Sequence, residues 1–181
     1  MKKKNSVFIA TSLDGYIADQ DGAIDWLHEI PNPEGSDMGY KEFTSQIDAL
    51  VMGRKTFDTV CSFDMDWPYD KPVFVVSNTL SVIPQKAESK AHLVNGTLNQ
   101  VLDKIHRQGY FLLYVDGGTT IQNFLQEDLI DEMVITVIPV LLGGGIRLFG
   151  DLAERRTFEC THSELFSNKV VQNHFRRVRK D

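Results

Sequence analysis

Two segments of the sequence decide the fold class: residues 50–56, which read LVMGRKT, and residues 114–120, which read YVDGGTT. In each segment, a short apolar run typical of a buried strand is followed by glycine and then by the start of a helical pattern. Similar apolar runs occupy residues 73–76 and 133–138, and residues 98–108 have the apolar spacing of a helix. Because strands alternate with helices, the sequence predicts an α/β protein whose mainly parallel sheet has helices on both faces.

The C-terminal part of the chain departs from this alternation. Residues 157–166 and 170–178 are both extended in character, and Ser167, Asn168 and Lys169 between them form a turn-like link. Two extended segments joined by so short a link are typical of an antiparallel hairpin. We therefore expect an antiparallel hairpin at one edge of the sheet.

Composition excludes several classes of protein. The chain has 181 residues, which fits one domain, and 42% of them are apolar. The 19 basic and 25 acidic residues give a net charge of −6, which disfavours a nucleic-acid partner. No apolar run approaches the ~18 residues of a membrane helix. Cys61 and Cys160 form no paired motif and the five histidines have no ligand spacing, so we expect a cytoplasmic protein with reduced thiols and no metal site.

The two strand–glycine–helix junctions are candidate phosphate sites. Free backbone N–H groups at a helix start attract anions, and glycine lets phosphate oxygens approach the backbone. Thr119 and Thr120 add hydroxyl donors at one junction, and Arg54 and Lys55 add positive charge at the other. The GxGxxG pattern of NAD-binding folds is missing, and a basic pair suits a 2′-phosphate, so NADPH is favoured over NADH. The alternative, that the glycines serve only close packing, stays open.

Four motifs in the same order carry a resemblance to a known family. They are residues 9–18 (IATSLDGYIA), residues 52–57 (MGRKTF), residues 116–118 (DGG) and residues 138–145 (IPVLLGGG). With these motifs the chain resembles the dihydrofolate-reductase-like family, most closely the C-terminal reductase domain of the bifunctional riboflavin-biosynthesis deaminase-reductase. The resemblance implies a single reductase-like domain over residues 1–181, with a mixed, mainly parallel sheet of about eight strands, and a homodimer.

The resemblance also implies an NADPH site. Ala10 and Ile17 would border the nicotinamide. The adenosine 2′-phosphate and the pyrophosphate would be held by Gly53, Arg54, Lys55, Thr56, Ser77, Asn78, Gly117, Gly118, Thr119 and Thr120. The implied reaction is hydride transfer to a small pyrimidine- or pterin-like heterocycle, as in 5-amino-6-(5-phosphoribosylamino)uracil reductase of riboflavin biosynthesis. The alternatives are a dihydrofolate or xenobiotic reductase, and a nucleotide-binding or interaction protein that kept the fold without the reaction.

Two departures from the riboflavin reductases concern the substrate. Tyr16 stands where they usually have lysine, and Asp116 stands where they usually have glutamate. Tyr16 and Trp26 are candidate substrate contacts, because either ring can stack on a flat heterocycle; each can equally belong to the core.

Asp37 and Asp14 are the candidate proton donors, and ordered water is the alternative to both. Asp37 lies fifteen residues before the methionine of MGR, like the pterin-binding carboxylate of dihydrofolate reductases. Its other interpretation is a cap on a helix whose apolar stripe is Met38, Phe43 and Ile47. Asp14 precedes Gly15 and is also a typical turn residue. The sequence does not decide between these roles.

Overall fold

The computed structural model describes residues 2–32, 35–166 and 169–179. The strands are β1 (Lys4–Ser12), β2 (Tyr16–Ala18), β3 (Ala49–Gly53), β4 (Val73–Val76), β5 (Ala91–Val94), β6 (Leu112–Asp116), β7 (Glu132–Ile138), β8 (Ile146–Arg147), β9 (Phe158–Phe166) and β10 (Val170–Arg177). The α-helices are α1 (Tyr40–Ser45), α2 (Arg54–Ser62), α3 (Leu98–Arg107) and α4 (Gly118–Gln126), and short 3-10 turns cover Asp25–His28 and Gln85–Ala87. Among the described residues, no helix is both long enough and apolar enough to cross a membrane.

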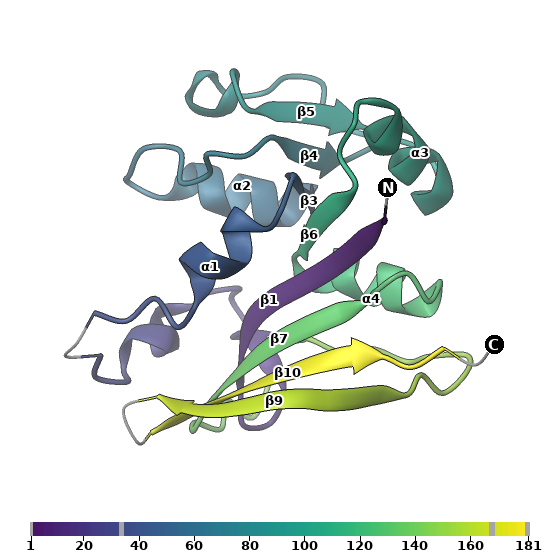
Figure 1. Cartoon of the computed structure of the whole chain (residues 1–181). Helices are drawn as coiled ribbons and strands as arrows, with labels where there is room; N and C mark the ends of the chain where they lie inside the picture. The colour runs from purple at the N-terminus through teal and green to yellow at the C-terminus, as the bar shows by residue number, and fades with distance from the viewer. Residues whose placement is uncertain (1, 33–34, 167–168, 180–181) are drawn as a thin grey trace.

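Eight strands form one mixed sheet in the order β5-β4-β3-β6-β1-β7-β10-β9 (Figure 1). The ladders from β5 to β7 are parallel, and β10 pairs antiparallel with both β7 and β9. The predicted α/β fold and the antiparallel hairpin at the sheet edge are therefore confirmed. Ser167 and Asn168 of the predicted link lie outside the described residues.

The two faces of the sheet bury different sets of apolar side chains. On one face, α3 and α4 cover β-strand residues such as Val51 and Val115. On the other face, α1 and α2 pack on alternate residues of the same strands, such as Met52 and Tyr114. Figure 1 shows the two helix pairs on opposite sides of the sheet. Apolar runs in the central strands are explained by burial on both faces.

The helix predicted after Asp37 is shorter than its apolar stripe suggested. It begins at Tyr40, because Met38 and Gly39 adopt positive φ angles of 50° and 82° that interrupt a right-handed helix. Of the predicted stripe, only Phe43 lies in the helix. Met38 precedes it, and Ile47 follows it as a buried residue of the link to β3.

A small second sheet was not expected. Strands β2 and β8 pair antiparallel at Tyr16–Arg147 and Ala18–Ile146. Its side chains reach α4: a Cβ added to Gly118 would lie 3.0 Å from Ile17 Cδ1 and 3.1 Å from Ile146 Cγ2. This ribbon thus packs on the start of α4, next to one of the candidate phosphate turns.

Candidate functional site

The main sheet opens between β1 and β6. These parallel neighbours pair only from Lys4–Leu112 to Ser6–Tyr114, whereas β6 stays paired with β3 as far as Asp116. Beyond Ser6, the Phe8 carbonyl of β1 accepts a hydrogen bond from the Tyr114 hydroxyl at 2.9 Å. The chain also changes direction here, since β3, β4 and β5 extend the sheet one way before β6 returns beside β1. Such switch points bind ligands at the carboxyl ends of the strands in open α/β sheets.

The two glycine junctions singled out in the sequence touch each other at this point. A Cβ added to Gly53, at the end of β3, would lie 2.8 Å from the Thr120 hydroxyl of α4. A Cβ added to Gly117, after β6, would overlap the Thr56 hydroxyl of α2. The backbone of Gly117 also has φ 89° and ψ 135°, a conformation that residues with a side chain rarely adopt. Segments more than sixty residues apart thus form one structure in which each threonine fills the space above the other junction's glycine.

Both helices that start at these glycines begin without a side-chain cap. Neither Gly53 before α2 nor Gly117 before α4 contributes a capping hydrogen bond, so the first N–H groups of both helices have no side-chain acceptor at the N-cap. Thr119 is exposed in the first turn of α4, and Lys55 is exposed in the first turn of α2. Free amides at two adjacent helix starts are suited to the oxygens of a pyrophosphate.

Arg54 and the loop after β4 come together beside the first junction. The Arg54 guanidinium donates to the Thr79 hydroxyl at 3.0 Å and to the Asp58 carboxylate at 3.2 Å. Ser77 Oγ accepts from the backbone N–H groups of Thr79 at 3.2 Å and Leu80 at 2.9 Å, which shapes this loop; Asn78 is exposed on it. The predicted partners Arg54, Ser77 and Asn78 are therefore neighbours. Thr79, which the sequence analysis missed, is the residue that links them.

Asp116 is the titratable group that the sequence analysis did not place in the site. It ends β6, and its Oδ1 accepts a hydrogen bond from the Gly117 N–H at 2.8 Å. Burial raises the pKa of this carboxyl to about 6, against the smaller lowering by the Gly117 N–H. Burial, reinforced by the negative charge of Asp116, also raises the pKa of Tyr40 to about 12. Asp116 forms no salt bridge with a described residue, so only the Gly117 N–H favours its ionised form.

Tyr40, Tyr69 and Tyr114 lie near enough to this carboxyl, on the α1 and α2 face, for its charge to raise their pKa values. The Tyr40 ring lies edge-on to Tyr114 at 6.5 Å, and the Trp67 and Tyr69 rings lie 5.4 Å apart. Burial, then Asp116, raises the pKa values of Tyr69 and Tyr114 as well. The only sequence signal for this environment was a lone acidic residue at the end of an apolar strand before Gly-Gly.

The two aspartates predicted as proton donors both bind backbone amides, Asp14 in the distant loop after β7 and Asp37 in its own loop. Asp14 accepts from the Ser12 hydroxyl at 2.6 Å and from the N–H groups of Gly143 at 2.8 Å and Leu142 at 3.1 Å. These bonds, the Ser12 bond first, hold the pKa of Asp14 below its usual value. Asp37 is exposed and accepts from the Gly39 and Lys41 N–H groups, both at 3.1 Å, at the start of α1. These contacts match the capping and turn interpretations, and the catalytic roles stay predictions.

The predicted substrate contacts are both buried. Tyr16 is 8% exposed, and the Arg147 guanidinium lies 5.0 Å from the centre of its ring. Trp26 is 5% exposed and packs with Ile138 and Val170; Ala10 lies against the same cluster, while Ile17 packs with the α3 and α4 face. The stacking role of the two rings stays a prediction. Within the described ranges, no group of three or more His, Cys, Asp or Glu residues is arranged to hold a metal ion.

Comparison with known proteins shows a family match and several similar proteins. The family model described as the RibD C-terminal domain matches residues 4–172. The chain is 34% identical over 181 residues to the uncharacterized protein YwjB of Bacillus subtilis, covering 98% of this chain and all of YwjB. It is also similar to a crystal structure of a Shewanella sp. PV-4 protein ascribed to riboflavin biosynthesis, with 53% identity, a TM-score of 0.94 and coverage of 97% and 99% of the two chains.

A more distant structure shares only the fold. Dihydrofolate reductase of Enterococcus faecalis, complexed with NADP(H), matches with a TM-score of 0.65, 14% identity and coverage of 96% of both chains.

Proposed function

The chain belongs to the family of RibD C-terminal domains, and we propose that it is an NADPH-dependent reductase that transfers a hydride to a small, flat, pyrimidine- or pterin-like heterocycle. The observation that carries this proposal is Asp116. Its carboxyl has a pKa of about 6 and lies where β1 and β6 separate, next to the two touching glycine junctions. A carboxyl whose pKa is raised toward neutral pH is suited to protonate a ring atom as the ring is reduced.

The residues present fit NADPH. The first turn of α4, with Gly118, Thr119 and Thr120, offers N–H and hydroxyl donors for a pyrophosphate. Arg54, with Ser77, Asn78 and Thr79, offers a cation and hydroxyl donors for the 2′-phosphate, and Lys55 adds charge on the same helix. The bound cofactor would supply the hydride, and the protein would supply its placement and the proton.

The function is tested by following NADPH absorbance with the purified protein and a panel of substrates. The panel comprises the phosphoribosylamino-pyrimidine of riboflavin biosynthesis, dihydrofolate and unphosphorylated pteridines. We expect weak turnover of the phosphoribosylated compound, about tenfold to a hundredfold below an unphosphorylated ring, because Tyr16 replaces a lysine that could meet an anionic group. Efficient turnover of that compound would contradict this expectation. NADPH binding without turnover of any member would favour a nucleotide-binding protein.

Cofactor choice depends on Arg54. Arg54→Ala removes a charge-assisted contact to the 2′-phosphate and is expected to weaken NADPH binding by about 1.5–3 kcal/mol, with little effect on NADH. Fluorescence titration of both cofactors measures this. Arg107→Ala, which removes the same charge from the end of α3, is the matched control. Equal affinity of the wild type for NADH and NADPH would contradict the assignment of NADPH as the cofactor.

We also expect a homodimer. The edge strand β9 leaves one side without a strand partner among the described residues, and edges of this kind are usually covered or blunted. Arg176 lies 3.7 Å from Glu159 and 3.9 Å from Glu132, so its charge is partly matched within the sheet. Sedimentation equilibrium should give twice the chain mass of 20.5 kDa. A mass near that of one chain at micromolar concentration would refute the dimer.

A further inference from the structure

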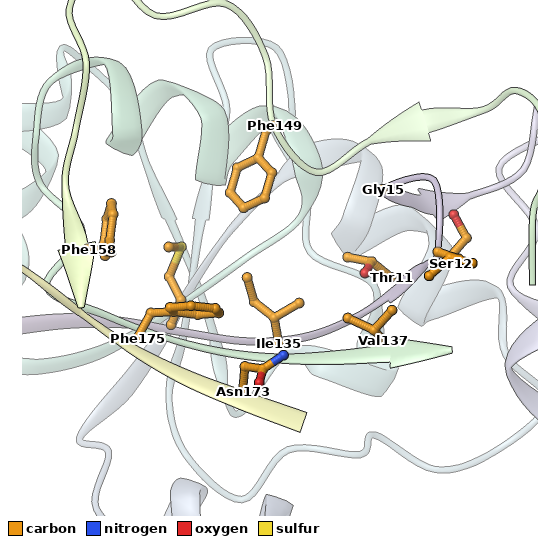
Figure 2. Close-up of a pocket in the computed structure, with 11 residues that line it drawn as sticks. Thr11, Ser12, Gly15, Ile135, Val137, Phe149, Phe158, Asn173 and Phe175 are labelled. Atoms are coloured by element: carbon orange, nitrogen blue, oxygen red, sulfur yellow. The ribbon is translucent and has the colours of Figure 1, made fainter. Parts of the chain in front are cut away.

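A pocket of about 330 Å³ lies on the face of the sheet that carries α3 and α4. Its floor is formed by Ile135 and Val137 of β7 and by Phe175 of β10. Figure 2 shows Phe149 and Phe158 standing over this floor. Pockets of roughly 300–1,000 Å³ with apolar and aromatic walls are typical of small-molecule sites.

The sheet separates this pocket from Asp116, the proposed proton donor. Ile135 and Val137 point to the α3 and α4 face, while their neighbours Thr136 and Ile138 point to the other. Asp116 alternates with Val115 in the same way and lies on the face of α1 and α2. A ligand in the pocket would therefore occupy a position distinct from that of a ring beside Asp116.

Two polar side chains of the pocket have hydrogen-bonding capacity to spare. Thr11 is only 4% exposed, yet its hydroxyl takes part in no hydrogen bond with the described residues. Asn173 Oδ1 accepts from the Ser163 hydroxyl at 2.8 Å, which leaves the amide N–H groups of Asn173 free toward the pocket (Figure 2). Ser12, by contrast, is satisfied, since its hydroxyl donates to Asp14 and accepts from the Tyr16 N–H. Thr11 and Asn173 therefore present donors that a ligand in the pocket can use.

From these contacts we propose that the pocket is a second small-molecule site, which binds an uncharged aromatic compound carrying a carbonyl oxygen. None of the described residues that line it is charged, which excludes an ionic ligand. The rings of Phe149, Phe158 and Phe175 suit a flat aromatic body. The carbonyl oxygen accepts from the Thr11 hydroxyl and the Asn173 amide, so the two free donors identify the polar end of the ligand.

The test uses para-fluorobenzamide as the carbonyl probe and fluorobenzene as the probe without it, each titrated by fluorine NMR. Para-fluorobenzamide should bind the wild type, and Thr11→Val should weaken it about fivefold to tenfold, the loss of one hydrogen bond. Fluorobenzene should bind more weakly and be indifferent to Thr11→Val. Thr161→Val, an exposed position on β9 outside the pocket, is the matched control and should leave both probes unchanged.

Saturating NADPH should leave the binding of para-fluorobenzamide intact, because no residue of the two glycine junctions is among those that line the pocket. If Thr11→Val fails to fold, Asn173→Ala gives the same comparison. The proposal is overturned if the carbonyl probe does not bind, if NADPH displaces it, or if neither variant distinguishes the two probes. A last outcome would also overturn it: the wild type is a dimer that does not bind the probe, and Phe149→Asp is a monomer that does. In that case the pocket is covered by a second copy of the chain.

Discussion

Asp116→Asn is expected to lower kcat for the proposed reduction by about 10²- to 10⁴-fold, the usual contribution of a general acid. An amide keeps the shape and the hydrogen bond from the Gly117 N–H but has no acidic proton to transfer. Since burial raises the pKa of Asp116 to about 6, the wild-type kcat should fall as pH rises through that value. The kcat of the variant should be low at every pH and should show no fall near pH 6.

Matched substitutions at the other two aspartates test the assignment. Asp37→Asn should reduce kcat far less than Asp116→Asn, because Asp37 is exposed and accepts from the Lys41 N–H in the first turn of α1. Asp14→Asn should act mainly on the loop whose N–H groups at Leu142 and Gly143 it binds. Steady-state kinetics of all three variants across pH separate these outcomes. If Asp37→Asn loses activity while Asp116→Asn stays active, the proton donor is Asp37 and not Asp116.

The same substitution has a stability readout that needs no substrate. A carboxyl whose folded pKa of about 6 exceeds its ordinary 3.8 stabilises the fold only in its protonated form. That contribution is fully present below pH 3.8 and is lost as pH rises through about 6. Asp116→Asn should therefore be more stable than the wild type at pH 8, by up to about 3 kcal/mol, and the difference should close toward pH 4. Denaturant unfolding at both pH values measures this, and a constant difference would contradict the shifted pKa.

Gly117→Ala is expected to destabilise the fold by more than about 1–3 kcal/mol and to abolish NADPH binding. The backbone strain of a non-glycine residue at φ 89° and ψ 135° accounts for that range alone. In addition, the new Cβ would overlap the Thr56 hydroxyl, so the contact between the two glycine junctions must open. Both phosphate-binding turns would then shift together.

Gly22→Ala is the control for this experiment. Gly22 has a similar φ of 82°, but a Cβ there meets no atom within 4 Å. It should therefore cost about 1 kcal/mol through backbone strain and leave cofactor binding intact. Thermal unfolding and cofactor titration of both variants separate strain from overlap. If Gly117→Ala proves no worse than Gly22→Ala, the junctions are not held together by the Thr56 contact.

The fold was predictable because its signals are local. Apolar runs such as residues 73–76 need burial on both faces, and glycine after a strand followed by helical spacing is typical of a parallel sheet. The structure confirmed these elements and the C-terminal hairpin to within a few residues. The pattern failed where a local backbone preference overrode the apolar spacing, as at Met38 and Gly39, or where a strand was only two or three residues long, as in β2 and β8.

The sequence by itself also determined which residues stand at the candidate phosphate turns, because glycine, hydroxyl and basic residues there mark the chemistry directly. Only the tertiary structure decided how they meet: Thr56 against Gly117, Thr120 against Gly53, and Thr79 on Arg54. It also decided that Asp116 rather than Asp14 has a raised pKa. The physical reason is that a carboxyl's pKa depends on burial and hydrogen-bond donors contributed by distant segments. In this protein, those segments converge where β1 and β6 part.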